Sequence, residues 1–344
     1  MNILIKSYNR PYLLHFTLKS IYKNIVGDYN VTIVDDGTPD VYLKKLYDEF
    51  PTVKIIKTIY YEEKSAIIRN YENSKPDSSY VKLPHSDWNK VVNSFAFDYF
   101  LILEDDQFVV KKIDLDNLQK IIDNYNLQFL QFNILNKKKF SFPFKEHMEG
   151  VYIYDSKSFL RKIKKFNFLF QPSDFYKLII KIFKKLKFKY FKLNFNNDIL
   201  DLYNVYIISG VIYKLKYWNI CVGSAKDELN ENQQLSCAVN YNLKNNGELY
   251  FGITKEPHVK TTFNNTSLGD NRGVNFDTTL FNILMNKLWF KNDLSYFDET
   301  DYELNVNCVV NYLKNENNPN CNYDEWLKYT QLFENCYKDQ GYDL

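Results

Sequence analysis

The sequence predicts an α/β fold in which helices flank a mostly parallel β-sheet. Apolar runs with strand character alternate with amphipathic helical segments through the first third of the chain, as expected when helices cover such a sheet. The acidic and polar clusters that follow these runs are typical of the sheet edge where open α/β folds bind ligands. Hydrophobic residues make up 45% of the 344 residues and aromatic residues 17%, enough for a well-packed core.

The first two strand–helix units are the clearest in the chain. Residues 2–7, with the sequence NILIKS, predict a buried strand, and residues 10–24 predict an amphipathic helix that opens with an Arg-Pro pair. Residues 31–34 predict a second strand, and the turn-forming residues 35–40 lead into a helix over about 40–50. Each unit therefore places a polar segment directly after its strand.

Two more predicted strands follow. Residues 53–59 predict the third strand, and residues 64–73 and 88–97 predict helices. Residues 99–103, YFLIL, predict an apolar strand that runs directly into the acidic residues 104–106. A third strand end thus carries polar side chains.

The remainder of the chain has less regular signals. Residues 160–195 form an insertion in which aromatic and aliphatic residues alternate with lysine and arginine, and acidic residues are nearly absent. We place a domain boundary near residue 275, between an α/β domain over 1–275 and a helical C-terminal region over 276–344. The other predicted elements are strands over 127–135, 150–154 and 205–213, and helices over 230–243, 277–292 and 323–337.

Charge and cysteine usage exclude several classes of protein. The formal net charge of +2 is nearly balanced, which argues against a nucleic-acid binder. The five cysteines are odd in number and include no CxxC pair, so we expect neither a disulfide framework nor a structural zinc site. No secretion signal opens the chain, and lysines interrupt every apolar segment before the roughly 20 residues of a membrane span. We therefore expect a cytoplasmic protein.

The acidic tripeptide Glu104-Asp105-Asp106 is the strongest indication of chemistry. Adjacent carboxylates at the end of a buried strand repel one another unless a cation or a basic group neutralises them. A divalent cation, Mn²⁺ or Mg²⁺, takes oxygen ligands and bridges carboxylates to a diphosphate, which stabilises the leaving nucleoside diphosphate in a sugar transfer. Alone, such a tripeptide is more often an acidic surface turn. The residues at the other strand ends therefore decide between a metal site and a surface turn.

Both other strand ends carry suitable residues. Asp35 and Asp36 follow the second strand, and their carboxylates can accept hydrogen bonds from a base or a ribose. The segment SYNRP at residues 7–11 follows the first strand, where the ring of Tyr8 could stack on a base. If the strands are parallel, three loops converge at one edge of the sheet.

Taken together, these motifs resemble those of the GT-A glycosyltransferases, especially the family 2-like ones. The matching segments are ILIKSYNRPYLLHFTLKSI for the first strand and helix, VTIVDDGTPD for the second strand and turn, SAIIRN for a helix bearing an arginine, and DYFLILEDDQF for the metal motif. The resemblance covers roughly residues 2–110, and less closely 205–260. It implies a GT-A, Rossmann-like nucleotide-diphospho-sugar transferase fold with a helical C-terminal extension.

The resemblance also implies roles for individual residues. Ser7, Asn9 and Asp35 would contact the nucleoside, and Glu104 and Asp106 would hold the ribose, metal and diphosphate. The sequence departs from the usual pattern in its glutamate at the first tripeptide position and in a long segment, 71–97, ahead of it. The expected nucleotide-sugar-binding residues are Ser7, Tyr8, Asn9, Arg10, Asp35, Asp36, Arg69, Glu104 and Asp105, and the expected metal ligands are Asp106, Glu104 and His258.

The general base of an inverting transfer is sought among acids near residue 230. By the resemblance, an acidic residue that opens a helix after the acceptor-side strand takes the proton of the acceptor hydroxyl, as a carboxylate can. Here SGVIYKLKYW is followed by KDELNENQ, in which we choose Glu231, with Asp227 and Glu228 behind it. The alternative, that these acids only cap a helix at its positive end, stays equally open.

His258 and the insertion over 160–195 each have a functional and a purely structural interpretation. His258 is a metal ligand by the resemblance, and imidazole suits Mn²⁺ better than Mg²⁺; a surface histidine is the alternative. The basic aromatic insertion over 160–195 could lay an apolar face against a membrane while its lysines meet anionic headgroups. Its alternative is an ordinary amphipathic helix whose lysine stems cover the core. The functional interpretation would place the protein at the inner face of a membrane.

The leading hypothesis is therefore a metal-dependent, inverting glycosyltransferase. It would move a sugar from a nucleoside-diphosphate sugar, with UDP-sugars favoured, to a hydroxyl of a glycan or lipid-linked acceptor in polysaccharide or glycoconjugate biosynthesis. A nucleotidyltransferase is one alternative, although those enzymes usually carry a Gly-rich loop where this chain has SYNRP. A non-catalytic GT-A-like scaffold at a membrane surface is the other.

Overall fold

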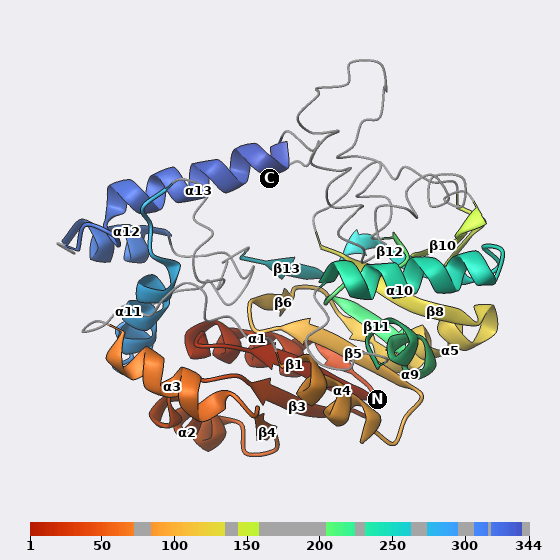
Figure 1. The fold of residues 1–344 in the computed structure, drawn as a ribbon, viewed down its shortest axis with the longest axis horizontal. Coiled ribbons are helices and arrows are strands. Elements are labelled where there is room, and N and C mark those ends of the chain that lie inside the picture. The colour runs from red at the N-terminus through yellow and green to blue at the C-terminus, as the bar shows by residue number, and fades with distance from the viewer. Residues whose placement is uncertain are drawn as a thin grey trace, which may run out of the picture.

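A central sheet of nine strands organises the fold, in the order β4-β3-β1-β5-β11-β8-β12-β10-β9 (Figure 1). The computed structural model describes residues 1–71, 84–134, 144–157, 204–223, 231–262, 274–294, 306–315 and 318–338. In the sheet, β11 and β10 run opposite to the other seven strands. The predicted α/β fold, with helices flanking a mostly parallel sheet, is confirmed.

The elements predicted from the sequence that fall in the described residues have the predicted type, whereas the helices over 115–125 and 306–315 were not predicted. The strands of the sheet are β1 (Asn2–Ser7), β3 (Asn30–Asp35), β4 (Lys54–Lys57), β5 (Tyr99–Glu104), β8 (Leu127–Asn133), β9 (Glu146–Met148), β10 (Val151–Asp155), β11 (Val211–Lys214) and β12 (Tyr250–Pro257). Two short ladders pair β2 (Ile25–Val26) with β7 (Ile113–Asp114) and β6 (Gln107–Val109) with β13 (Val259–Thr261). The helices are α1 (Pro11–Asn24), α2 (Asp40–Glu49), α3 (Tyr61–Asn70), α4 (His85–Asn93), α5 (Leu115–Tyr125), α9 (Leu215–Trp218) with a π-helical turn η3 (Asn219–Gly223), α10 (Glu231–Lys244), α11 (Thr278–Phe290), α12 (Val306–Asn315) and α13 (Tyr323–Lys338).

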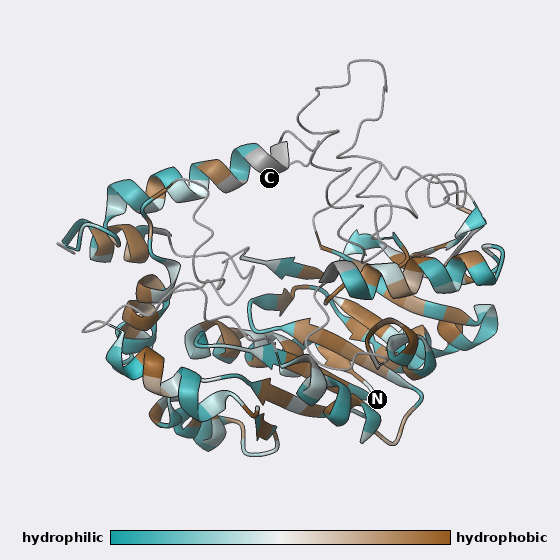
Figure 2. Cartoon of the chain, in the orientation of Figure 1, coloured by the Kyte–Doolittle hydropathy of each residue, from teal (hydrophilic) through white to brown (hydrophobic). Residues whose placement is uncertain are grey.

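Alternating side chains divide the apolar core between the two faces of the sheet. In β1, Ile3 and Ile5 belong to the core that α1, α5 and α11 cover. Leu4, between them, belongs to the opposite core, which contains Trp88 of α4 and Val239 of α10. Figure 2 shows this arrangement as hydrophobic strands in the centre and helices whose outer surfaces are hydrophilic.

Strand register brings the three polar segments to one edge. β1 lies between β3 and β5 and is parallel to both, with Ser7 opposite Asp35 and Lys6 opposite Glu104. The segments that follow these strands, beginning at Tyr8, Asp36 and Asp105, therefore emerge side by side at the carboxyl end of the sheet. This is the geometry that the motif spacing predicted.

The strand predicted over 205–213 is shorter in the structure, where β11 begins only at Val211. Gly210 has a φ of 69°, in the left-handed region, and ends the strand conformation. Buried tyrosine hydroxyls instead hold residues 204–207: Tyr154 donates to the Asn204 carbonyl at 2.9 Å, and Tyr213 donates to the Ile207 carbonyl at 2.7 Å and accepts from its amide at 3.1 Å. Side chains thus satisfy backbone groups that a ladder would otherwise pair.

The region beyond residue 275 packs onto the sheet domain. α11 lies against α1 and α2 (Figure 1), and Met285 and Trp289 of this helix are buried in the same core as Leu13. Val309 of α12 and Tyr329 of α13 extend that core. Within the described ranges, no helix combines the length and apolar character of a membrane span. The insertion over 160–195 lies outside the described residues.

Tyr213→Phe tests the support of the segment before β11. Because the variant removes the partner of both backbone groups of Ile207, we expect the free energy of unfolding to fall by about 1–3 kcal/mol. Urea denaturation followed by circular dichroism measures the change. Tyr22→Phe is the matched control, since its exposed hydroxyl bonds Thr52 Oγ1, and we expect a loss below about 0.5 kcal/mol. Equal losses would contradict the role of the Tyr213 hydroxyl.

Candidate functional site

Arg10 joins the first strand end to the acidic tripeptide. Its guanidinium pairs with Asp105 and lies 3.2 Å from Asp106 Oδ2. The backbone amide of Tyr8 donates to Asp105 Oδ2 at 3.1 Å, and Thr17 Oγ1 donates to the Asp105 carbonyl at 2.7 Å. Asp105 is fully buried among these partners, which tie it to the loop at residues 8–10.

Lys6 and Glu104 form a second ion pair across neighbouring strands. Lys6 Nζ lies 2.9 Å from Glu104 Oε1 and donates to the Ile208 carbonyl at 3.3 Å. The ammonium also lies 4.9 Å from the centre of the Trp88 ring, a cation–π contact. Burial raises the pKa of Glu104 and Lys6 lowers it, with a net downward direction. The Glu104 side chain keeps 34% of its surface exposed, so it still faces the edge.

Asp35 organises the turn after β3. The carboxylate is fully buried and accepts from the Gly37 amide at 3.0 Å, the Thr38 amide at 2.7 Å and Thr38 Oγ1 at 2.7 Å. Gly37 has a φ of 134°, and a Cβ there would lie 2.6 Å from Cβ of Lys64, so only glycine fits. Burial raises the pKa of Asp35 although these hydrogen bonds oppose the rise.

Asp36, the next residue, pairs with Lys64 from the buried face of α3. Thr58 Oγ1 donates to the other Asp36 oxygen at 2.6 Å. The Lys64 ammonium lies 5.4 Å from the ring centre of Tyr8 and 5.7 Å from that of Tyr60. Burial raises the pKa of Asp36 to about 6, against the lowering effect of Lys64. α3 thereby supplies the cation that this strand end needs.

Asp106 is the least satisfied carboxylate of the site. Thr262 Oγ1 lies 3.2 Å from its Oδ2, and the Thr262 amide donates to its carbonyl at 3.3 Å. Its Oδ1 is buried and has no hydrogen-bond partner among the described residues. Burial raises the pKa of Asp106, and the Arg10 guanidinium opposes the rise. A buried carboxylate oxygen without a partner is costly, so Asp106 Oδ1 could accept a cation.

A charge count supports this assignment. Within the described residues, five carboxyl groups meet three basic side chains, so the fully ionised cluster carries two more negative than positive charges. In the described ranges, no group of three or more His, Cys, Asp or Glu side chains is arranged so that it could hold a metal ion by itself. Mg²⁺ is commonly bound by one or two carboxylates plus substrate phosphates, and Glu104 and Asp106 fit that pattern. The carboxyl groups are those of Asp35, Asp36, Glu104, Asp105 and Asp106, and the basic groups those of Lys6, Arg10 and Lys64.

The structure does not bring His258 to Asp106. In the antiparallel β6–β13 ladder, Thr262 lies beside Asp106, whereas the His258 carbonyl accepts from the Val110 amide. Asp106 and His258 are thus separated by four residues along the ladder, or roughly 13 Å at about 3.4 Å per residue. His258 Nδ1 lies 2.9 Å from the Glu256 carbonyl, and the residue lines a separate cavity of about 440 Å³.

The other predicted site residues have different surroundings in the structure. Ser7 is buried at the end of β1, and Arg69 is exposed, with its guanidinium 2.9 Å from Ser65 Oγ. The Asn9 side chain is 1% exposed and faces α11, where its Oδ1 accepts from Asn286 at 3.0 Å. Asp227 and Glu228 lie outside the described residues, and Glu231 begins α10, with a side chain that is likewise not described.

Lys6 and Lys64 were not among the residues expected from the sequence, yet both neutralise site carboxylates. Lys64 had a signal: with Tyr61, Ser65 and Ile68 it forms the buried face of α3 at helical spacing. Lys6 had a weaker sequence signal, because it is a charged residue inside an apolar strand.

Asp36→Asn tests the charge balance at the second strand end. Because the pKa of Asp36 in the folded state, about 6, exceeds the ordinary aspartate pKa of 3.8, the wild-type free energy of unfolding should fall as pH rises from about 4 to 6. Relative to wild type, the variant should therefore gain up to roughly 3 kcal/mol over this range and no more above it, at about 1.4 kcal/mol per tenfold change in proton affinity. Chemical denaturation at several pH values measures the difference. Asp48→Asn removes an exposed carboxylate that pairs with Lys44 and serves as the control. A pH-independent difference for Asp36→Asn would contradict the assignment.

Comparison with known proteins finds structures but no sequence families. No protein-family model matches the chain, and no curated protein matches it. S. aureus TarS 1-349 in complex with UDP-GlcNAc matches at 13% identity and a TM-score of 0.42, over 83% of this chain and 66% of that one. The chain spans 60% of the length of another TarS 1-349 structure.

Two structures of named sugar transferases also match. The galactosyltransferase LgtC, in complex with donor and acceptor sugar analogs, matches at 12% identity and a TM-score of 0.37, over 87% of this chain and 98% of that one. The mannosyltransferase PcManGT from Pyrobaculum calidifontis, in complex with GDP-Man and Mn²⁺, matches at 12% identity and a TM-score of 0.28, over 40% of this chain and 36% of that one. The expected resemblance to glycosyltransferase structures is thus found, at values from which no activity follows, so function has to be argued from the chain's own residues.

Proposed function

We propose that the chain is a glycosyltransferase that transfers a sugar from a nucleoside-diphosphate sugar to a hydroxyl group. One observation carries the proposal: three neighbouring strand ends meet in a cluster of five carboxyl groups and three basic groups, with a buried oxygen of Asp106 unpaired. A divalent cation would supply positive charge at that oxygen, and the oxygens of a diphosphate would complete its set of ligands. A nucleoside-diphosphate sugar is the substrate class that needs such a site.

The residues divide into binding and positioning groups. The nucleoside would lie over the turn at Asp35 and Asp36, beside the Tyr8 ring, which Lys64 already contacts on one side. Glu104 and Asp106 would hold Mn²⁺ or Mg²⁺, which when bound neutralises the charge on the diphosphate. Arg10 holds Asp105 and keeps the loop in place. UDP-sugars remain the favoured donors.

The chemical step requires a base on the acceptor side. In an inverting transfer the acceptor oxygen forms a bond to the sugar C1 as the bond from C1 to the diphosphate oxygen breaks. The acceptor proton passes to a carboxylate, for which Glu231 at the start of α10 is our candidate, with Asp227 and Glu228 before it. A glycan or lipid-linked hydroxyl is the proposed acceptor class, and peripheral contact through residues 160–195 remains part of this proposal.

Calorimetric titration with UDP in the presence of Mn²⁺ tests the site. We expect Asp106→Asn to weaken UDP binding by tenfold or more, about 1.4 kcal/mol, because the amide keeps the shape but removes a charged ligand. Omitting Mn²⁺ should weaken wild-type binding in the same way. Asp48→Asn serves as the control and should bind as wild type does.

Equal heats from wild type and Asp106→Asn would remove the basis for a metal–diphosphate site. Binding without transfer or hydrolysis of any sugar from a donor panel would instead favour the non-catalytic scaffold. Thermal stabilisation across that panel would identify the donor, since a ligand that binds the folded state raises the melting temperature.

A further inference from the structure

We infer that α11 is part of the nucleotide site, and that Asn286 is the residue through which it positions the loop at residues 8–10. The inference rests on the proposed function only for what the site binds. The structural part concerns a set of buried hydrogen bonds that begins in a helix beyond residue 275 and ends at Asp35.

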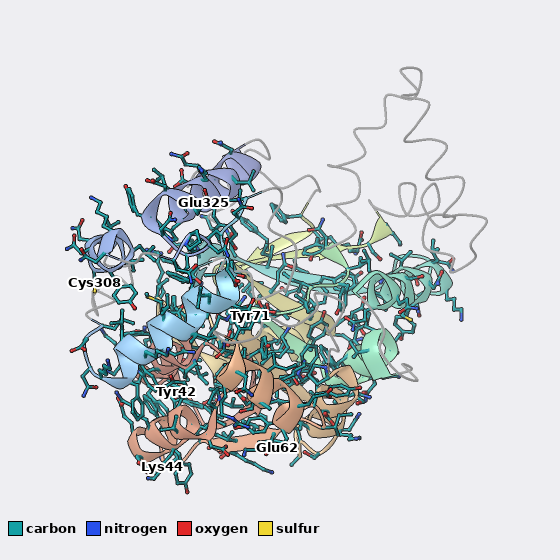
Figure 3. All side chains as sticks on the ribbon, turned by 60° about the vertical axis from the view of Figure 1, so that its left-hand side comes forward. Tyr42, Lys44, Glu62, Tyr71, Cys308 and Glu325 are labelled. Atoms are coloured by element: carbon teal, nitrogen blue, oxygen red, sulfur yellow. The ribbon has the colours of Figure 1, made fainter. Side chains whose placement is uncertain are left out.

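α11 is an apolar helix with a buried polar stripe. Its side chains Asn282 and Asn286 are 1% and 0% exposed and lie one helical turn apart on the same face. Asp277 caps the helix at the Leu280 amide, at 3.0 Å, and accepts from the Tyr71 hydroxyl. Figure 3 shows Tyr71, from the end of α3, beside this helix. Burying amides costs free energy unless they are bonded, so the partners of this stripe are informative.

Each residue of the stripe binds a different part of the site framework. Asn282 Oδ1 accepts from the Tyr12 hydroxyl of α1 at 2.9 Å. Asn286 Nδ2 donates to both the carbonyl and the side-chain oxygen of Asn9, at 3.1 and 3.0 Å. Asn286 therefore contacts the loop itself, whereas Asn282 anchors the helix that follows it.

Asn9 has an uncommon backbone conformation. Its φ of 52° is in the left-handed region, which asparagine tolerates but does not prefer. This conformation reverses the chain between Tyr8 and Arg10, so that the amide of one and the guanidinium of the other both reach Asp105. The two hydrogen bonds from Asn286 hold Asn9 in this conformation.

The hydrogen bonds continue from Asn9 to the second strand end. The Asn9 amide donates to Thr38 Oγ1 at 3.0 Å, and Thr38 Oγ1 donates to Asp35 Oδ2 at 2.7 Å. Asn9, Thr38 and Asp35 are all buried, so no water is needed to complete the path. One loop conformation thus sets the position of both nucleotide-binding strand ends, and α11 sets the loop.

The test compares two isosteric variants on the same face of α11. Asn286→Leu removes the donor to Asn9, whereas Asn282→Leu removes the acceptor for Tyr12 and leaves Asn9 bonded. Both should lower the melting temperature. Only Asn286→Leu should increase amide hydrogen exchange in peptides that cover residues 7–10 and 36–38, and only it should weaken UDP–Mn²⁺ binding, by about tenfold.

A rescue variant separates positioning from general packing. Asn9→Gly adopts a positive φ at no steric cost, so in the Asn286→Leu background it should restore part of the UDP affinity without restoring the melting temperature. The inference would be overturned if the two leucine variants had the same amide hydrogen exchange and the same UDP–Mn²⁺ affinity. It would also be overturned if Asn9→Gly restored no UDP affinity beyond the experimental error. If wild type binds no nucleotide, the proposed function fails, and hydrogen exchange alone still decides the role of Asn286.

Discussion

The fold has to place five carboxyl groups, four of them buried, at one edge of a sheet, and most of the polar contacts at that edge follow from this constraint. Taking a charge out of water is expensive unless a partner compensates it within the protein. The three compensating cations come from a strand, a loop and a helix: Lys6, Arg10 and Lys64. Each ion pair therefore also fixes the position of one element relative to another. Stability and site geometry are products of the same contacts.

The donors around the carboxyl groups are unevenly distributed. Asp105 has several donors around it, whereas Asp106 keeps one buried oxygen without a partner in the described chain and Glu104 stays partly exposed. If the cluster were fully neutralised by the protein, a metal–diphosphate complex would gain little on binding. The unpaired oxygen lies beside residues that the other ion pairs hold rigid, which is the arrangement a preorganised ligand site requires.

The sequence predicted the parts of the molecule that depend on local pattern. Apolar runs and turn residues located the early strands, and the parallel arrangement placed Ser7, Asp35 and Glu104 at one edge. It could not predict partners that depend on register or on helix docking. Lys6 meets Glu104 only because β1 and β5 pair in one register, and no local pattern sets that register. The position of His258 depends on the β6–β13 ladder, which separates it from Asp106 although both follow strands of the same sheet edge.

The region beyond residue 275 also shows the difference between local sequence pattern and contacts between distant segments. From the sequence we place a domain boundary near residue 275, but a boundary in sequence becomes a physical one only where few contacts cross it. α11 buries apolar side chains in the core of α1, and two of its amides bond to Tyr12 of α1 and to Asn9 in the loop at residues 8–10. An apolar helix needs no buried asparagines to pack, and burying an amide costs free energy unless it is hydrogen-bonded. The hydrogen bonds of Asn286 to Asn9, which has a positive φ, give this amide a role in the loop. A helix near the end of the chain therefore has a structural reason to belong to a site that is otherwise built from the first 110 residues.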